Sequence, residues 1–300
     1  MRLAIALALA LSASALAGPV IAQPAGATPS VSAFLNITPK RLTFDRNRRN
    51  GTVYLLNQGA GPVTVDIALV DRVMLPDGQI APVTEAERRQ DVKAAAAALK
   101  SAHDLLQVSP RRVTLQPGRP QTVRVRLSTL PDAAAGEHRS HLTVTTLPPP
   151  DTGVTAESAA AGAAPSDLRF QITAVYGLSI PLIVRPADAQ VGATLEGARL
   201  EYGEAPGDER APARQIAVVA LDVVRGGGSS VYGNFEVRVV GAAKSADPLG
   251  MARGVGVYPE VARRSVRIPL TRPPAPGERL EVTFTDDDTS PGKVLAKVAL

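Results

Sequence analysis

Residues 170–186, FQITAVYGLSIPLIVRP, decide the fold class because apolar side chains recur along them at every second position. The even-numbered positions carry Ile172, Ala174, Tyr176, Leu178, Ile180, Leu182 and Val184. A period of two is that of an extended strand and not of a helix. Because an ordinary strand has about 5 to 6 residues, this one has more apolar face than one small domain needs. We expect part of it to face another chain.

The length of the chain and its apolar content predict two domains. With 300 residues, of which 45% are hydrophobic, the chain exceeds the usual size of one β domain and can fill two cores. Arg185-Pro186-Ala187-Asp188 ends the long strand with a proline, which cannot continue a ladder of hydrogen bonds. We therefore expect one domain over residues 30–186 and a second over residues 190–300.

The N-terminus has the pattern of a secretory signal peptide. Residues 1–22 hold one Arg, an Ala- and Leu-rich run, and small residues before an expected cleavage after Ala22, with Ala17 as the alternative. No later stretch has the ~20 consecutive apolar residues of a membrane helix, so we expect an exported protein without membrane insertion. The chain has no cysteine, so core packing and not disulfide bonds must hold the exported fold.

Alternating apolar positions predict about seven strands in the first domain, as in an immunoglobulin-like sandwich. The expected strands lie on both sides of the charged turn 45–51, in 63–70, 121–127 and 136–146, and in the long stretch described above. Pro39 suits an edge or a switch between sheets. Thr84-Glu85-Ala86-Glu87 has the pattern of a capping box, which predicts one helix running to about Leu106 as an insert in the β pattern.

The second half of the chain repeats this alternation and predicts a second β-sandwich. The expected strands lie in 193–202, 215–225, 231–240, 263–270, 279–285 and 294–300. Glycine-rich residues 226–230 are expected to form a hairpin loop between two of them. The fold class predicted from the sequence is therefore all-β, with a short helical insert in the first domain.

The composition argues against nucleic acid as a partner. The net charge is +5, the basic residues are scattered along the chain, and aromatic residues amount to 3%. A nucleic-acid surface needs a clustered basic face with aromatic side chains on which bases can stack. We expect no nucleic-acid partner.

The histidine and aspartate residues of the chain do not have the spacing of metal ligands, so we expect no metal site. His138 and His141 are three apart, which places them on opposite faces of a strand. Asp286-Asp287-Asp288 lacks the spaced ligands and final Glu of a calcium loop and is expected to be a solvated hairpin turn.

No catalytic group can be assembled from the remaining motifs. Gly226-Gly227-Gly228 lies between two strands and does not open a helix, which a phosphate loop would need. Ser179, in GLSIP, lies inside a strand and lacks the second Gly of a nucleophile elbow. We expect a protein that is not an enzyme and that needs no cofactor.

Five segments of the first domain carry a family resemblance. They are ITPKRLTF, VYLLNQG, LLQVSPRRVTLQPGRPQTVRVRL, GEHRSHLTV and YGLSIPLIVRP, spread over residues 30–186. In these segments the chain resembles the periplasmic pilus-assembly chaperones, the PapD-like family. Its helical insert departs from the family pattern and indicates a divergent, non-classical branch. The resemblance implies two immunoglobulin-like sandwiches set at an angle and a periplasmic location. The second half of the chain carries no motif of the family, so its assignment to the family rests on its position after the first domain.

The resemblance implies a use for the long strand. In the family, the final strand of the first domain is lent to a pilus subunit whose own sandwich lacks a strand. By similarity, the donor strand contacts would come from Ile172, Ala174, Tyr176 and Leu178, while residues 180–184 would stay in the chaperone's own core. Burial of one large apolar side chain contributes about 1.5 to 3 kcal/mol.

The resemblance also implies an anchor for the subunit's C-terminal carboxylate. The family uses an Arg on the first strand and a Lys near the end of the donor strand. Arg41, in TPKRLTF, matches the first, but Pro181 occupies the Lys position. Arg139, the weaker anchor candidate beside Arg41, or Arg185 would have to replace the missing Lys.

Two hypotheses follow from the sequence. The first is a periplasmic chaperone that binds exported pilus or fimbrial subunits by donor-strand complementation and delivers them to an outer-membrane usher for assembly. The alternative is a structural or adhesive immunoglobulin-like module of a secreted appendage, in which the long strand is ordinary core. The first requires that the strand have an open edge beside a cleft.

Overall fold

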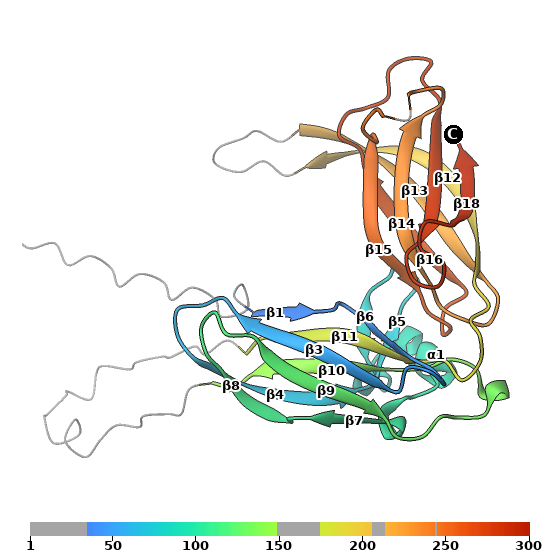
Figure 1. Ribbon diagram of the computed structural model, residues 1–300. Helices are drawn as coiled ribbons and strands as arrows, with labels where there is room; N and C mark the ends of the chain where they lie inside the picture. Colours follow the sequence, from blue (N-terminus) through green and yellow to red (C-terminus); the bar gives the residue numbers. More distant parts are fainter. Residues whose placement is uncertain (1–34, 149–174, 206–213, 244) are drawn as a thin grey trace, which may run out of the picture.

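The computed structural model describes residues 35–148, 175–205, 214–243 and 245–300. The expected signal peptide, and the expected donor residues Ile172 and Ala174, lie outside these ranges. The described residues form two β-sandwiches that meet at an angle, with a short helix inserted in the first (Figure 1). The expected fold class is therefore confirmed. Among the described helices, none is long and apolar enough to cross a membrane.

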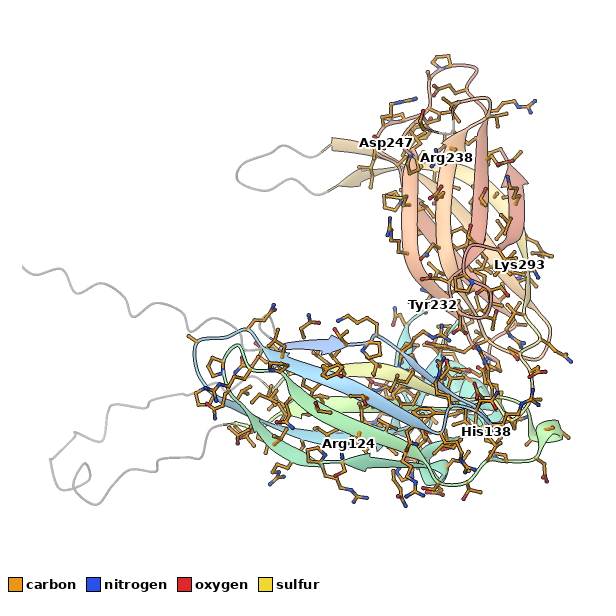
Figure 2. All side chains as sticks on the ribbon, viewed as in Figure 1. Arg124, His138, Tyr232, Arg238, Asp247 and Lys293 are labelled. Atoms are coloured by element: carbon orange, nitrogen blue, oxygen red, sulfur yellow. The ribbon has the colours of Figure 1, made fainter. Side chains whose placement is uncertain are left out.

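The N-terminal sandwich consists of a four-stranded sheet, ordered β1-β3-β9-β7, and a five-stranded sheet, ordered β2-β11-β10-β4-β8. Its strands are β1 (Leu35–Thr38), β2 (Leu42–Phe44), β3 (Asn50–Asn57), β4 (Val63–Val70), β7 (Leu106–Ser109), β8 (Arg112–Leu115), β9 (Gln121–Leu127), β10 (His138–Thr146) and β11 (Gly177–Val184). β1 and β2 belong to different sheets, so Pro39 lies at a switch between sheets, as expected. On β9, Val123 and Val125 are buried while Arg124 is exposed (Figure 2), which is the alternation that the sequence predicts.

The helical insert lies in the corner between the sandwiches and begins with a hairpin of β5 (Arg72–Met74) and β6 (Ile80–Pro82), followed by α1 (Gln90–Ala98) (Figure 1). The expected helix limits were wrong. α1 has Arg89 as its N-cap without a side-chain hydrogen bond, and it ends at Ala98 instead of near Leu106. The chain leaves the helix because the backbone of Ala102 pairs with β10, donating to Arg139 O at 3.2 Å.

The C-terminal sandwich packs a three-stranded sheet, β12-β13-β16, against a four-stranded sheet, β15-β14-β17-β18. Its strands are β12 (Gly192–Ala205), β13 (Arg214–Gly226), β14 (Val231–Val239), β15 (Gly250–Val257), β16 (Arg263–Pro269), β17 (Leu280–Asp286) and β18 (Val294–Ala299). β15 was not predicted, because Gly250, Gly254 and Gly256 interrupt its apolar pattern. The glycine-rich residues 226–230 are not a hairpin loop, since β13 and β14 lie in different sheets and the loop crosses between them.

The hairpin of the insert ties the two sandwiches together. The side chain of Met74 is buried in the core of the C-terminal sandwich, and Ile80 packs against the same core. Ser265 N donates to Pro76 O at 2.8 Å, and Met74 N donates to Glu260 Oε1 at 2.8 Å. Ile183 of β11 also packs into the C-terminal core. These contacts fix the corner on which the candidate site is built.

Candidate functional site

β11 is paired on both sides over only part of its length. β10 pairs with it from Gly177 to Val184, whereas β2 pairs only with Leu182–Val184. On the side away from β10, no strand of the described ranges pairs with residues 177–181. The strand thus leaves an open edge that runs away from the corner between the sandwiches.

The direction of the backbone groups along this edge follows from two hydrogen bonds. Thr146 N donates to Tyr176 O at 2.8 Å, and Arg185 N donates to Phe44 O at 2.8 Å. Because backbone groups alternate along a strand, even-numbered residues face β10 and odd-numbered residues face β2 and the open edge beyond it. Gly177 and Ser179 therefore offer N–H and C=O groups there. Pro181 is compatible with this edge because its missing N–H removes no bond to β10.

The side chains of β11 divide between the sandwich core and its outer face. Ile180, Leu182 and Val184 are buried in the N-terminal core, and Leu178 packs against that core while partly exposed. Tyr176, the next residue on the same face, is partly exposed beyond the end of β11, whereas Val175 on the other face is 56% exposed. The core-facing stripe therefore continues outward past the filled part of the core.

The inner end of β11 carries an ion cluster that joins the sandwiches. Arg185 donates from Nε to Glu137 Oε2 at 2.8 Å and from Nη2 to Asp288 Oδ2 at 2.8 Å. Ser230 Oγ accepts a further bond from Arg185 Nη2 at 3.1 Å. Burial alone would lower the pKa of Arg185, but the charges of Glu137 and Asp288 outweigh it and raise that pKa.

Arg41 lies in the same cluster. It directly precedes β2, and its Nη2 is 3.0 Å from Asp288 Oδ2. Its guanidinium carbon is 4.2 Å from the ring centroid of Tyr232, a residue at the end of the C-terminal sandwich nearest the corner (Figure 2). Asp288 thus bridges Arg41 and Arg185. Arg41 Nε and Nη1 are buried and have no hydrogen-bond partner among the described residues.

Arg139, the weaker of the two expected anchors, lies in a separate cluster on β10. Its side chain is 2% exposed and pairs with Glu260, whose side chain is 1% exposed. Its guanidinium also lies over the ring of Tyr258, 3.8 Å from the centroid, and donates to Arg72 O at 2.9 Å. This buried pair joins the N-terminal sandwich to the loop after β15, and among the described residues no hydrogen bond or ion pair links it to Arg41, Arg185 or Asp288.

The loop between β17 and β18 supplies the acidic half of the site, which the sequence did not predict. We expected the turn Asp286-Asp287-Asp288 to be solvated, and this expectation was wrong for Asp286 and Asp288. Asp286 is buried and accepts hydrogen bonds from Asp288 N at 2.9 Å and Ser290 N at 2.8 Å, which fixes the loop. The Asp288 side chain is only 15% exposed because it faces the two arginines. Among the described residues, no group of acidic or histidine side chains could hold a metal ion.

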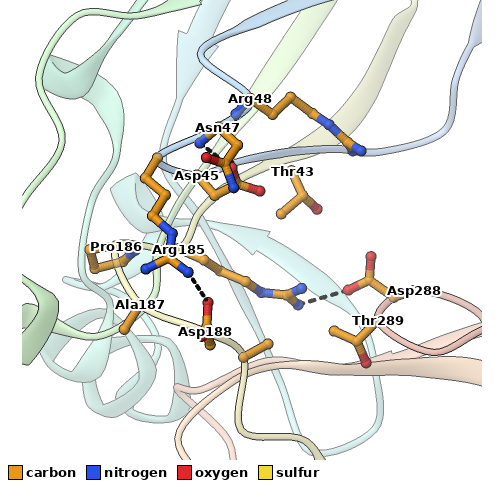
Figure 3. Close-up of a pocket in the computed structure, with 12 residues that line it drawn as sticks. Thr43, Asp45, Asn47, Arg48, Arg185, Pro186, Ala187, Asp188, Asp288 and Thr289 are labelled. Carbon is orange, nitrogen blue, oxygen red and sulfur yellow. Dashed lines mark hydrogen bonds and ion pairs between the residues drawn. The ribbon is translucent and has the colours of Figure 1, made fainter.

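A cavity of about 230 Å³ opens onto the contact between Arg185 and Asp288 (Figure 3). It is bounded by the turn after β2, the link after β11 and the loop after β17. Arg46 and Asp188 form an exposed ion pair at its rim, with 3.0 Å between Nη2 and Oδ1. The cavity gives a small anionic group a route to the cluster.

No protein-family model and no curated protein matches the chain. Its structure is similar to that of the YadV chaperone, at 13% identity and a TM-score of 0.40, over 89% of this chain and 99% of that one. The E. coli chaperone DraB is also 13% identical, over 89% and 98% of the two chains, with a TM-score of 0.40. The Pseudomonas aeruginosa CupB2 chaperone is 12% identical, over 88% and 97%, with a TM-score of 0.41. These solved structures are of the PapD-like kind that the sequence motifs resemble.

Proposed function

We propose that this protein is a periplasmic chaperone that binds exported pilus or fimbrial subunits by donating β11 to them. The observation that carries the proposal is the open edge of β11 over residues 177–181, which ends beside a cluster of arginines in the corner between the sandwiches. A subunit that lacks one strand can add its own edge to this one. The chaperone then delivers the subunit to an outer-membrane usher, and no nucleotide or other cofactor takes part.

The backbone of β11 supplies the register of such a complex. Gly177 and Ser179 present N–H and C=O groups to an incoming strand, and Val175 continues the series. Main-chain hydrogen bonds of this kind contribute on the order of 0.5–1.5 kcal/mol each after the loss of bonds to water. They align the subunit but contribute little of the specificity.

The stripe of even-numbered side chains supplies the apolar contact. Tyr176 and Leu178 continue the core-facing side of β11 outward, and Ile172 and Ala174, which lie outside the described residues, extend the same series in the sequence. Each large apolar side chain that enters the subunit's groove contributes about 1.5–3 kcal/mol. We therefore assign these four residues as the donor strand contacts.

The anchor for the subunit's terminal carboxylate is assigned to Arg41. Of the two candidates for the missing Lys, Arg185 shares Asp288 with Arg41, whereas Arg139 is paired with Glu260 in a separate cluster. We therefore include Arg185 as the second basic residue of the proposed anchor. A hydrogen bond between charged groups contributes about 1.5–3 kcal/mol.

The chain would reach the periplasm through a signal peptide cleaved after Ala22. Mass spectrometry of the mature protein, recovered from a periplasmic extract, would show an N-terminus at Gln23. An N-terminus that still includes residues 1–22 would contradict this assignment.

Co-expression with a fimbrial-type subunit tests strand donation. Ile172→Asp combined with Tyr176→Asp should abolish recovery of the complex, because two charges would enter the subunit's apolar groove. Val175→Asp is the matched control, since Val175 lies next to Tyr176 but on the opposite, exposed face of the strand. Equal recovery of the complex for wild type and the double variant would refute strand donation and favour a structural or adhesive module.

A further inference from the structure

The charges of the corner cluster balance without any client. Arg41 and Arg185 carry two positive charges, and Glu137 and Asp288 carry two negative charges within hydrogen-bond distance of them. With Pro181 at the position where a second free cation was expected, the cluster has no spare positive charge for another carboxylate. A further anion entering the cluster must displace one of the two acidic side chains.

The contacts of Arg41 indicate which of the two acidic side chains, Glu137 or Asp288, an entering anion would displace. Among the described residues, Glu137 forms its ion pair with Arg185 and accepts a further hydrogen bond from Ser230 N, so its departure would free nothing on Arg41. Arg41 Nε and Nη1 are shielded from solvent, and its Nη2 is the nitrogen that binds Asp288. The ring of Tyr232 covers one face of the guanidinium. A carboxylate can therefore reach Arg41 only where the carboxylate of Asp288 now lies.

We propose that Asp288 is an internal competitor for the carboxylate site of Arg41, so that a client's terminal carboxylate binds by exchange with the Asp288 side chain. This inference rests on the proposed function for its client, but the exchange itself is a property of the free protein. It assigns a specificity role to a residue of the C-terminal sandwich. A client that makes too few contacts along β11 would fail to displace Asp288.

Two features of the structure support exchange over simple addition. The cavity beside the contact between Arg185 and Asp288 gives an anion a path to the competitor (Figure 3). Arg185 retains Glu137 and Ser230 as partners when Asp288 moves away, so the interdomain cluster is not left without a countercharge. Asp288 can therefore release Arg41 without leaving Arg185 as an unpaired buried cation.

Acetate is the probe for this exchange, because it is a carboxylate without any strand to donate to. It would be titrated into ¹⁵N-labelled full-length mature protein, at constant ionic strength set with sodium chloride, while the Nε–Hε signal of Arg41 is followed. Asp288→Asn should bind acetate at least about tenfold more tightly than wild type, because it removes the competing charge from Arg41. Adding Arg41→Ala to Asp288→Asn should abolish the gain.

Glu137→Gln is the matched control, since it removes one negative charge from Arg185 but leaves the contact between Asp288 and Arg41 in place. It should bind acetate no more tightly than wild type. An equal gain in Glu137→Gln and Asp288→Asn would overturn the proposal, because a general rise in positive charge would then explain both. No gain in Asp288→Asn would also overturn it.

The test survives a folding failure of either variant. Asp288→Ser serves as a second variant and should show the same gain in acetate affinity as Asp288→Asn. A wild-type acetate affinity equal to that of Asp288→Ser would overturn exchange. Failure of the proposed function has a different signature. In that case the acetate results would stand, while the recovery of a co-expressed subunit would not depend on Tyr176 or Arg41.

Discussion

Neutralising Glu260 should destabilise the whole molecule, because its partner Arg139 would remain as an unpaired buried cation. The two side chains are 1% and 2% exposed and come from different sandwiches. In Glu260→Gln, the retained oxygen can still accept the hydrogen bond from Met74 N, so the charge is the main change. Removing one partner of a buried ion pair costs about 3–5 kcal/mol. This is a large part of a typical free energy of unfolding, which is on the order of 5–15 kcal/mol.

Urea unfolding followed by circular dichroism would measure this cost. The matched control is Glu281→Gln, which breaks the ion pair between Glu281 and Lys297. The side chain of Glu281 is 42% exposed and that of Lys297 is 50% exposed. Glu281→Gln should cost less than about 1 kcal/mol. Adding Arg139→Met to Glu260→Gln should recover most of the stability, because no buried charge is then left unpaired. A cost below about 1 kcal/mol for Glu260→Gln, or no recovery in the double variant, would refute this reasoning.

Two further predictions concern the corner between the sandwiches. Burial, with the charges of Arg139 and Arg72, lowers the pKa of His141 from 6.5 to about 3. The unfolded chain therefore takes up the proton first, and the free energy of unfolding should fall by about 1.4 kcal/mol per pH unit between pH 6.5 and about 3. Urea unfolding at several pH values should show a flatter dependence for His141→Gln, and equal slopes would contradict the assignment. Met74→Ala should cost about 2–5 kcal/mol by opening a cavity in the C-terminal core. The control Met251→Ala, at a position 47% exposed, should cost less than about 0.5 kcal/mol. Thermal unfolding would compare the two variants, and similar decreases in melting temperature for Met74→Ala and Met251→Ala would count against the docking of the hairpin.

The fold class could be predicted from the sequence because the strands are long and alternate cleanly. Val123, Val125 and Leu127 are buried with exposed Arg124 and Arg126 between them, which is the pattern that period-two reasoning uses. β15 was missed because this signal needs side chains, and three of its eight residues are glycine. The backbone pairing with β14 makes it a strand all the same.

The limits of the helix were missed for a different reason. Thr84 and Glu87 have the spacing of a capping box, but Val83–Glu85 form a single 3-10 turn after β6. Packing of Val92 and Ala95 against the hairpin then places α1 further along the chain. Local pattern predicted that a helix exists, and tertiary contacts decided where it begins and ends.

The candidate site was only half accessible to sequence reasoning. Arg41 was singled out by resemblance to a family motif, and the long strand by its periodicity. Asp288 has no motif around it, because its role comes from the angle at which the second sandwich meets the first. That angle depends on buried contacts such as the one between Arg139 and Glu260, whose partners are far apart in the sequence.

Amide hydrogen exchange at Gly177 and Ser179 tests the central claim most directly. Their N–H groups face the open edge of β11 in the free protein, so they should exchange rapidly, while Leu178 and Ile180, which face β10, exchange slowly. In a complex with a fimbrial-type subunit, Gly177 and Ser179 should become as protected as their neighbours. If the complex forms and these two amides exchange as rapidly as before, β11 is not donated.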